Sequence, residues 1–110
     1  MDDARAWTAV GPADDVTGPP WACHEVAGVR IRLARSDTGD IVALPDTCPH
    51  MGSPLDRAEV TDGQVHCPRH WYAYDAEDGH CVLPGGSAEG LVLHPVEVRD
   101  GIVHVSVGAG

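Results

Sequence analysis

The sequence predicts an all-β protein, and three observations support this class. Short stretches in which apolar and polar residues alternate recur along the chain, as expected for strands with one buried face. Clusters of Gly, Pro, Asp and Ser separate these stretches and are typical of turns. Long runs with helical periodicity are missing.

The first clear strand is expected over residues 29–35, where apolar residues alternate with Arg30 and Arg32 and so occupy the opposite face. Residues 36–40 are Ser, Asp, Thr, Gly and Asp, a composition that predicts a turn. The chain then returns in residues 41–44 as a more buried strand, because all four of these residues are apolar.

The strongest local signal lies near the C-terminal end. Residues 96–99 and 102–105 both alternate, and Asp100 and Gly101 stand between them. An Asp-Gly pair between two alternating stretches predicts a β-hairpin with a two-residue turn.

The length and net charge of the chain restrict its domain number and the classes of partner it can bind. The 110 residues suit one domain, which we expect to span 1–110. Seventeen acidic residues face seven arginines and no lysine, so the formal net charge is −10. Such a chain repels phosphate backbones and anionic lipid, so we expect neither nucleic acid nor a membrane as a partner. The acidic N-terminal residues differ from a signal peptide, and we expect a cytoplasmic protein.

The middle of the chain, residues 45–86, reads as loops around short strands and carries the candidate metal site. Cys48 and His50 form one pair, and Cys67 and His70 form a second pair after sixteen intervening residues. Two Cys and two His could bind one tetrahedral zinc ion. Structural zinc sites usually pair Cys with Cys and His with His, whereas here each loop is mixed. Mixed loops favour a two-iron centre with both thiolates on one iron and both imidazoles on the other.

The sequence around these pairs resembles the Rieske family from about residue 7 onward. Residues 48–55 (CPHMGSPL) are similar to the first cluster loop of that family, and residues 67–75 (CPRHWYAYD) to the second. Residues 83–86 (LPGG) stand where the family has a proline-containing loop, and residues 93–105 are similar to its closing hairpin. The resemblance implies one Rieske-type [2Fe–2S] cluster per chain.

The resemblance also implies a fold and a set of site residues. We expect an antiparallel β-sandwich with a cluster-binding subdomain inserted at about 45–85. The expected ligands are Cys48, His50, Cys67 and His70. The residues expected around the cluster are Met51, Trp71, Tyr74 and Pro84.

Departures from the family indicate the type of Rieske protein. Ser53 and Arg69 replace the two additional cysteines that form a disulfide in respiratory Rieske proteins. The bulky pair Trp71 and Tyr72 is similar to soluble ferredoxins of aromatic-ring oxygenases, particularly the toluene-monooxygenase type. Tyr74 stands where high-potential members use a tyrosine to hydrogen-bond a ligand sulfur.

These features predict an electron carrier rather than an enzyme. The chain contains no nucleophile–base motif and no phosphate-binding glycine loop. We expect a monomeric ferredoxin that receives single electrons from a flavin-dependent reductase and delivers them to a terminal oxygenase of Rieske or diiron type. The alternatives are the small subunit of an assimilatory nitrite reductase and a zinc-stabilised interaction module. The remaining cysteines, Cys23 and Cys81, are expected to be buried thiols rather than ligands.

Overall fold

The computed structural model describes residues 6–49, 52, 54–67, 72–83 and 90–107. Within these residues the chain forms strands and one short 3₁₀ helix, and no helix there is long and apolar enough to cross a membrane. In chain order the elements are β1 (Thr8–Pro12), η1 (Ala13–Asp15), β2 (Cys23–Val26), β3 (Val29–Arg35), β4 (Ile41–Pro45), β5 (Glu59–Thr61), β6 (Gln64–His66), β7 (Ala73–Asp75), β8 (Cys81–Leu83), β9 (Val96–Arg99) and β10 (Ile102–Val105).

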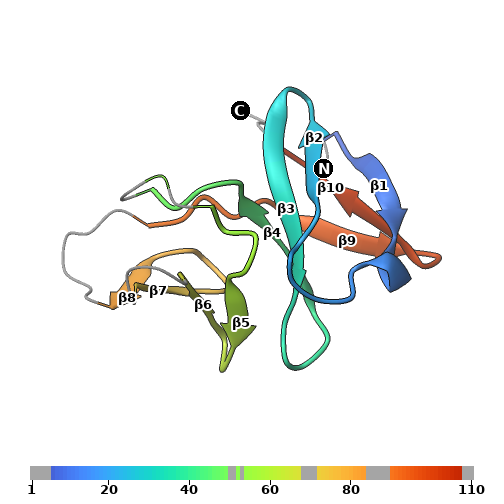
Figure 1. Ribbon diagram of the computed structural model, residues 1–110. Helices are drawn as coiled ribbons and strands as arrows, with labels where there is room; N and C mark the ends of the chain where they lie inside the picture. Colours follow the sequence, from blue (N-terminus) through green and yellow to red (C-terminus); the bar gives the residue numbers. More distant parts are fainter. Residues whose placement is uncertain (1–5, 50–51, 53, 68–71, 84–89, 108–110) are drawn as a thin grey trace.

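The strands form three antiparallel sheets. Strands β1, β10 and β9 make one three-stranded sheet and β2, β3 and β4 make another, while β5 to β8 form a four-stranded meander. Figure 1 shows the meander to one side of the two smaller sheets, which lie together on the other side. The predicted all-β antiparallel fold is therefore confirmed, and β3, β4, β9 and β10 match the predicted strands.

The hairpin predicted near the C-terminal end is also confirmed. Val98 of β9 pairs with Val103 of β10. The turn residues Asp100 and Gly101 have φ angles of 53° and 80°. Two positive φ values identify the turn geometry whose twist matches that of the flanking strands, and glycine adopts the second of them without steric cost.

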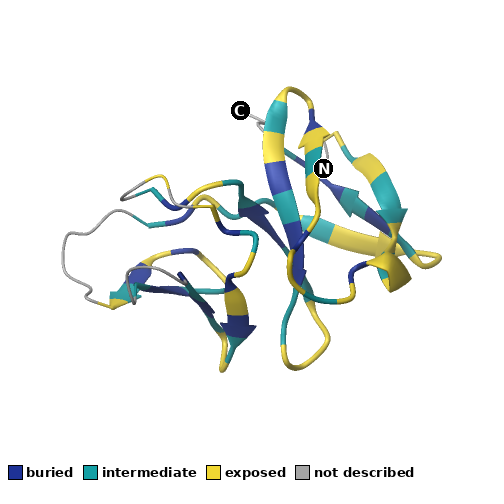
Figure 2. Cartoon of the chain, in the orientation of Figure 1, coloured by how far each residue is buried: buried dark blue, intermediate teal, exposed yellow. Residues whose placement is uncertain are grey.

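One hydrophobic core joins the three sheets (Figure 2). Ile31 and Leu33 of β3 are buried, as the alternation predicts, and pack in the same cluster as Val103 and Val105 of β10. The cluster continues into the four-stranded sheet through the buried Val65 of β6. This continuity supports the loops that leave β4 and β6, where the candidate site residues lie.

Candidate metal centre

Two of the four predicted ligands lie in the described residues. Cys48 follows β4 and Cys67 follows β6 directly, and their exposed fractions are only 1% and 4%. Both thiols are free of disulfide bonds. His50 and His70 lie outside the described residues, as do the cluster-environment candidates Met51, Trp71 and Pro84.

The loop that carries Cys48 is closed by backbone contacts at its base. The amide of Leu55 donates to the carbonyl of Asp46 at 3.0 Å, and Thr47 and Pro54 form an isolated antiparallel bridge. Inside this closure the carbonyl of Cys48 accepts a hydrogen bond from the amide of Gly52 at 3.0 Å. Cys48 is thus held in a short hairpin-like loop.

The loop that carries Cys67 is closed in a similar way. The amide of Cys67 donates to the carbonyl of Tyr72 at 2.9 Å, where the chain returns toward β7. Beyond this point β6 and β7 pair through His66 and Ala73. The second predicted ligand loop therefore begins and ends at one place in the four-stranded sheet.

Tyr74 of β7 connects this sheet to the Cys48 loop. Its side chain is fully buried, and its hydroxyl oxygen lies 3.5 Å from the Sγ atom of Cys48. Burial raises the pKa of the Tyr74 hydroxyl far above its usual value, and the contact with Cys48 raises this pKa further. The phenol is therefore a neutral O–H group next to the sulfur. Tyr74, which the resemblance places near the cluster, is thus a buried residue beside one predicted ligand.

The donor set in the described residues fits an iron–sulfur group. Two cysteine sulfurs are shielded from water on separate loops, and a hydroxyl lies beside one of them. Soft thiolate ligands of this kind select iron–sulfur clusters and zinc. The residues present are thus compatible with a cluster, and the two predicted histidines would complete its ligands.

The two remaining cysteines differ from each other. Cys81 is buried as expected, and its Sγ lies 3.2 Å from the carbonyl of Leu83. The expectation that Cys23 is buried is wrong, because its side chain is exposed. In the four-residue strand β2 the core-facing position is Val26, so Cys23, three residues away, points to the opposite face.

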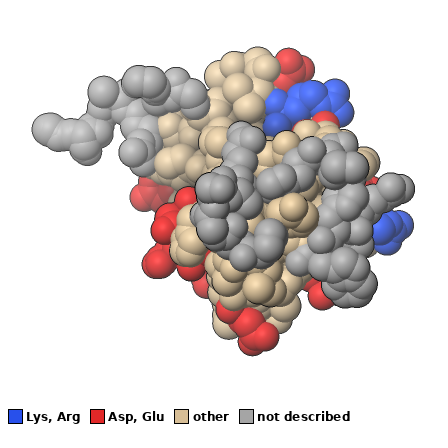
Figure 3. All heavy atoms as spheres, turned by 90° about the vertical axis from the view of Figure 1, so that its left-hand side faces the viewer, with Lys and Arg blue, Asp and Glu red and all other residues tan. Residues whose placement is uncertain are grey.

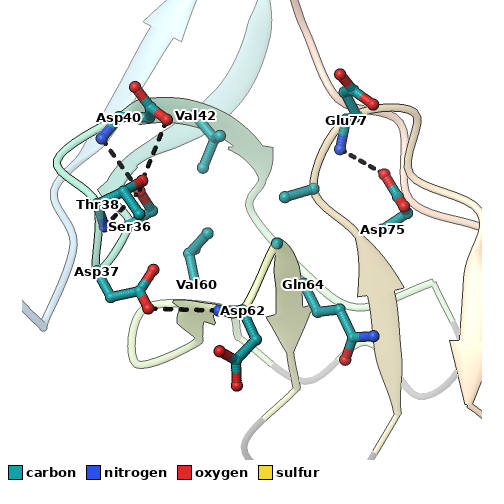
Figure 4. Close-up of a pocket in the computed structure, with 12 residues that line it drawn as sticks. Ser36, Asp37, Thr38, Asp40, Val42, Val60, Asp62, Gln64, Asp75 and Glu77 are labelled. Atoms are coloured by element: carbon teal, nitrogen blue, oxygen red, sulfur yellow. Dashed lines mark hydrogen bonds between the residues drawn. The ribbon is translucent and has the colours of Figure 1, made fainter.

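An acidic cleft of about 790 Å³ lies between the β3–β4 loop and the four-stranded sheet (Figure 4). Five carboxylates line it, and its lining residues include no Arg or His. These carboxylates belong to Asp37, Asp40, Asp62, Asp75 and Glu77. Figure 3 views the molecule from the side on which the four-stranded sheet lies, and acidic side chains are visible along the margins of this face. The sequence indicates the net negative charge of the chain, whereas the gathering of these carboxylates around one cleft depends on the tertiary fold.

The turn between β7 and β8 brings together three polar side chains that sequence spacing alone does not single out. Asp75, Asp78 and His80 place their potential ligand atoms within 4.8 Å of one another. The ring Nδ1 of His80 donates a hydrogen bond of 2.6 Å to Oδ1 of Asp78, which raises the pKa of His80, and this bond together with one from the His80 backbone amide lowers the pKa of Asp78. The exposed ion pair between Asp78 and His80, which closes the turn, explains why these side chains lie close together.

Comparisons with known proteins agree on the family. The family model of the Rieske [2Fe-2S] domain matches residues 6–92. The chain is 28% identical over 111 residues to the vanillate O-demethylase oxygenase subunit of Pseudomonas sp. (strain HR199 / DSM 7063), which covers 98% of this chain and 31% of the relative. It is also 28% identical over 110 residues to the oxygenase component of dicamba O-demethylase from Stenotrophomonas maltophilia, with 94% and 32% covered. The chain thus spans about a third of the length of these two relatives.

Solved structures show the same fold. Dicamba monooxygenase bound to dicamba superimposes with a TM-score of 0.75 at 25% identity over 94% of this chain and 32% of that one. A Mycobacterium tuberculosis protein assigned as the small subunit of an NADH-dependent nitrite reductase gives a TM-score of 0.82 at 23% identity, with 98% and 100% covered. These two relatives are an oxygenase subunit and an oxygenase component of O-demethylases, and one structural neighbour is assigned as a nitrite reductase small subunit. The chain belongs to the Rieske [2Fe–2S] domain family.

Proposed function

We propose that this chain is a Rieske-type ferredoxin that carries single electrons from a flavin-dependent reductase to a terminal oxygenase. The observation that carries the proposal is the pair of buried cysteines, Cys48 and Cys67, on two separately closed loops of a Rieske domain. When bound, a [2Fe–2S] cluster supplies a one-electron redox couple. Residues 1–110 form a single Rieske domain in this proposal, and residues 45–85 form its cluster-binding subdomain.

Each site residue has a defined task in this function. Cys48 and Cys67 would hold one iron through thiolates, and His50 and His70 would hold the other through imidazole nitrogens. Burial of both cysteines excludes water from the sulfurs. The Tyr74 hydroxyl would donate to the Cys48 sulfur. Met51, Trp71 and Pro84 are proposed to shield the cluster.

The experiment that tests the function follows one electron through the chain. The protein is mixed anaerobically with NADH and a flavin-dependent ferredoxin reductase, and bleaching of its visible absorbance is recorded. The reduced protein is then mixed with a terminal oxygenase of the same host. We expect one electron per chain to be taken up and then passed on. Failure to accept an electron from any such reductase would contradict the proposal.

The second candidate is a small subunit of a nitrite reductase, because the tuberculosis protein assigned to that role matches 98% of this chain and 100% of its own length. The same reduced protein distinguishes the two candidates. Reoxidation by a terminal oxygenase supports the ferredoxin. Stable association with a nitrite reductase catalytic subunit, together with nitrite-dependent NADH oxidation, supports the second candidate.

We expect Tyr74→Phe to lower the midpoint potential. A hydrogen bond to a ligand sulfur stabilises the more negative reduced state, and one such bond contributes about 1 kcal/mol, or about 40 mV for one electron. Protein-film voltammetry measures the shift, and the iron content of the variant serves as the control. An unchanged potential at full iron content would show that the hydroxyl does not tune the site.

Transfer from the reductase should slow as salt increases. The net charge of −10 favours a basic docking surface on the partner, and screening shortens from about 14 Å at 0.05 M salt to about 4 Å at 0.5 M. We expect the second-order rate constant to fall roughly tenfold over this range. Reduction by a small neutral mediator provides the control and should be nearly independent of salt. An equally salt-independent transfer from the reductase would exclude electrostatic steering.

A further inference from the structure

Polar contacts from β3 and from the segment before β2 converge on the base of the loop that carries Cys48. We call the described residues 46–49, 52 and 54–58 the Cys48 loop. Its incoming side begins at Asp46, two residues before Cys48, and its outgoing side includes Leu55, Asp56 and Ala58. The backbone bond of 3.0 Å between Leu55 and Asp46 and the bridge between Thr47 and Pro54 join the two sides.

The incoming side is held through the carboxylate of Asp46. Oδ1 lies 2.7 Å from Nη2 of Arg32, and Oδ2 accepts a hydrogen bond from Nε of Arg30 at 3.1 Å. The side chain of Arg32 is only 16% exposed and that of Asp46 23%, whereas that of Arg30 is 65% exposed. Ion pairs that are shielded from water are screened less, so the contact with Arg32 is the stronger anchor.

The outgoing side is held through Trp21. Its backbone amide donates to the carbonyl of Asp56 at 2.7 Å, and its indole Nε1 donates to the carbonyl of Ala58 at 2.7 Å. The Trp21 side chain is buried, which fixes the direction of the indole bond. The carbonyl of Trp21 in turn accepts a hydrogen bond from Nη1 of Arg32 at 2.7 Å.

The contacts that hold the two sides of the loop therefore both involve the guanidinium group of Arg32. Nη2 of Arg32 contacts the incoming side through Asp46, and Nη1 reaches the outgoing side through Trp21. The contact with Trp21 is a hydrogen bond, whereas the contact with Asp46 is an ion pair, because Oδ1 of Asp46 accepts no hydrogen bond from the described residues. The guanidinium is rigid and planar, so the positions of these two partners are coupled through it. A lysine ammonium at the same place keeps the charge but lacks this rigid plane.

We infer that Arg32 is a positioning residue that clamps both sides of the Cys48 loop and thereby sets the position of the Cys48 sulfur relative to the Tyr74 hydroxyl. The inference rests on the proposed function, because it concerns Cys48 as a cluster ligand. Arg32 lies in β3, which pairs with the strand β4 that leads into the Cys48 loop, and it acts through Asp46 and Trp21. The clamp keeps the loop in one arrangement during repeated electron transfer.

Arg32→Lys tests the clamp without changing the net charge. We expect iron to be released to a ferrous chelator about tenfold faster than from the wild-type protein, because the loop opens more often. The matched control is Arg99→Lys. Arg99 pairs with Glu97 at 2.7 Å within the distant β9 strand, and its replacement should leave iron release within about twofold of wild type.

The midpoint potential separates positioning from general stability. Arg32→Lys should lower the potential in the same direction as Tyr74→Phe, since a displaced Cys48 sulfur loses its contact with the hydroxyl. Adding Tyr74→Phe to Arg32→Lys should then cause a smaller further shift than Tyr74→Phe causes alone. Full additivity of the two shifts, with wild-type iron release in Arg32→Lys, would overturn the inference.

A second variant, Asp46→Asn, covers the case in which Arg32→Lys does not fold. It leaves Arg32 and its bond to Trp21 in place and weakens the contacts of Asp46 with Arg32 and Arg30. Amide hydrogen exchange should accelerate in residues 55–58 but remain unchanged in β10, and unchanged exchange in residues 55–58 would also overturn the inference. A wild-type protein without iron contradicts the proposed function and, with it, this inference. Full iron in the wild type with no effect of either variant contradicts the clamp alone.

Discussion

Replacing either buried cysteine of the predicted ligand set, Cys48→Ser or Cys67→Ser, should abolish cluster binding. Each variant is expected to purify with less than about a tenth of the wild-type iron and without visible absorbance, because serine does not supply the soft thiolate that iron–sulfur clusters require. Loss of the cluster should also destabilise the two loops. Limited proteolysis should therefore cleave the chain between residues 45 and 85 faster than in the wild type.

The other two cysteines provide controls in the same chain. Cys81 is buried like the predicted ligands, but its sulfur contacts the carbonyl of Leu83, and Cys23 is exposed on β2. Cys81→Ser and Cys23→Ser should each retain the wild-type iron content. Iron loss from Cys81→Ser equal to that from Cys48→Ser would place Cys81 in the site and contradict the ligand assignment.

Gly79→Ala should destabilise the folded protein by about 3 kcal/mol. Gly79 has a φ of +83°, and a Cβ atom there would collide with the carbonyl oxygen of Leu91. The two segments approach closely because the amide of Leu91 donates to the carbonyl of Gly79 at 2.7 Å. The substitution therefore adds backbone strain and also separates two paired segments. Urea unfolding of the wild type and the variant, each with full iron content, measures the difference.

Gly39→Ala separates these two effects. Gly39 has a φ of +94°, but a Cβ atom built there meets nothing within 4 Å. This variant should lose only the backbone contribution, about 1 kcal/mol. Equal losses in Gly39→Ala and Gly79→Ala would show that the close approach to Leu91 adds nothing to stability.

The sequence predicts those strands whose own residues show alternation or whose connecting residues are typical of a turn. Alternation predicts β3, and the Asp100–Gly101 pair predicts the hairpin of β9 and β10, because both depend on residues near each other in the chain. The sequence does not indicate that β1 pairs with β10 or that the strands divide into three sheets. Those features arise from contacts between residues far apart in the chain.

The exposure of Cys23 also depends on contacts between residues far apart in the chain. Cysteine is among the residues most often buried, so its type predicts a core position. Burial in β2 is instead decided by which face of this short strand meets the core, and Val26 occupies that face. Register is set by the neighbouring strand β3 and cannot be predicted from four residues.

The candidate site likewise contains some features that the sequence predicts and others that it does not. Spacing and resemblance predict Cys48 and Cys67 as ligands, and the resemblance predicts Tyr74 beside a ligand sulfur. The contact of Tyr74 with Cys48 agrees with this expectation. The link from Arg32 to Asp46 and Trp21 has no sequence signal, because these partners lie 14 and 11 positions from Arg32 and are joined through side-chain and backbone atoms. Arginines on a strand predict only an exposed face.

Metal and redox analysis of the purified protein addresses the proposed electron-carrier function most directly. The protein should contain two irons and two sulfides per chain with no zinc, and an anaerobic reductive titration should take up one electron per chain. One zinc per chain with no iron, or a chain that takes up no electron, would contradict the assignment as a Rieske-type electron carrier.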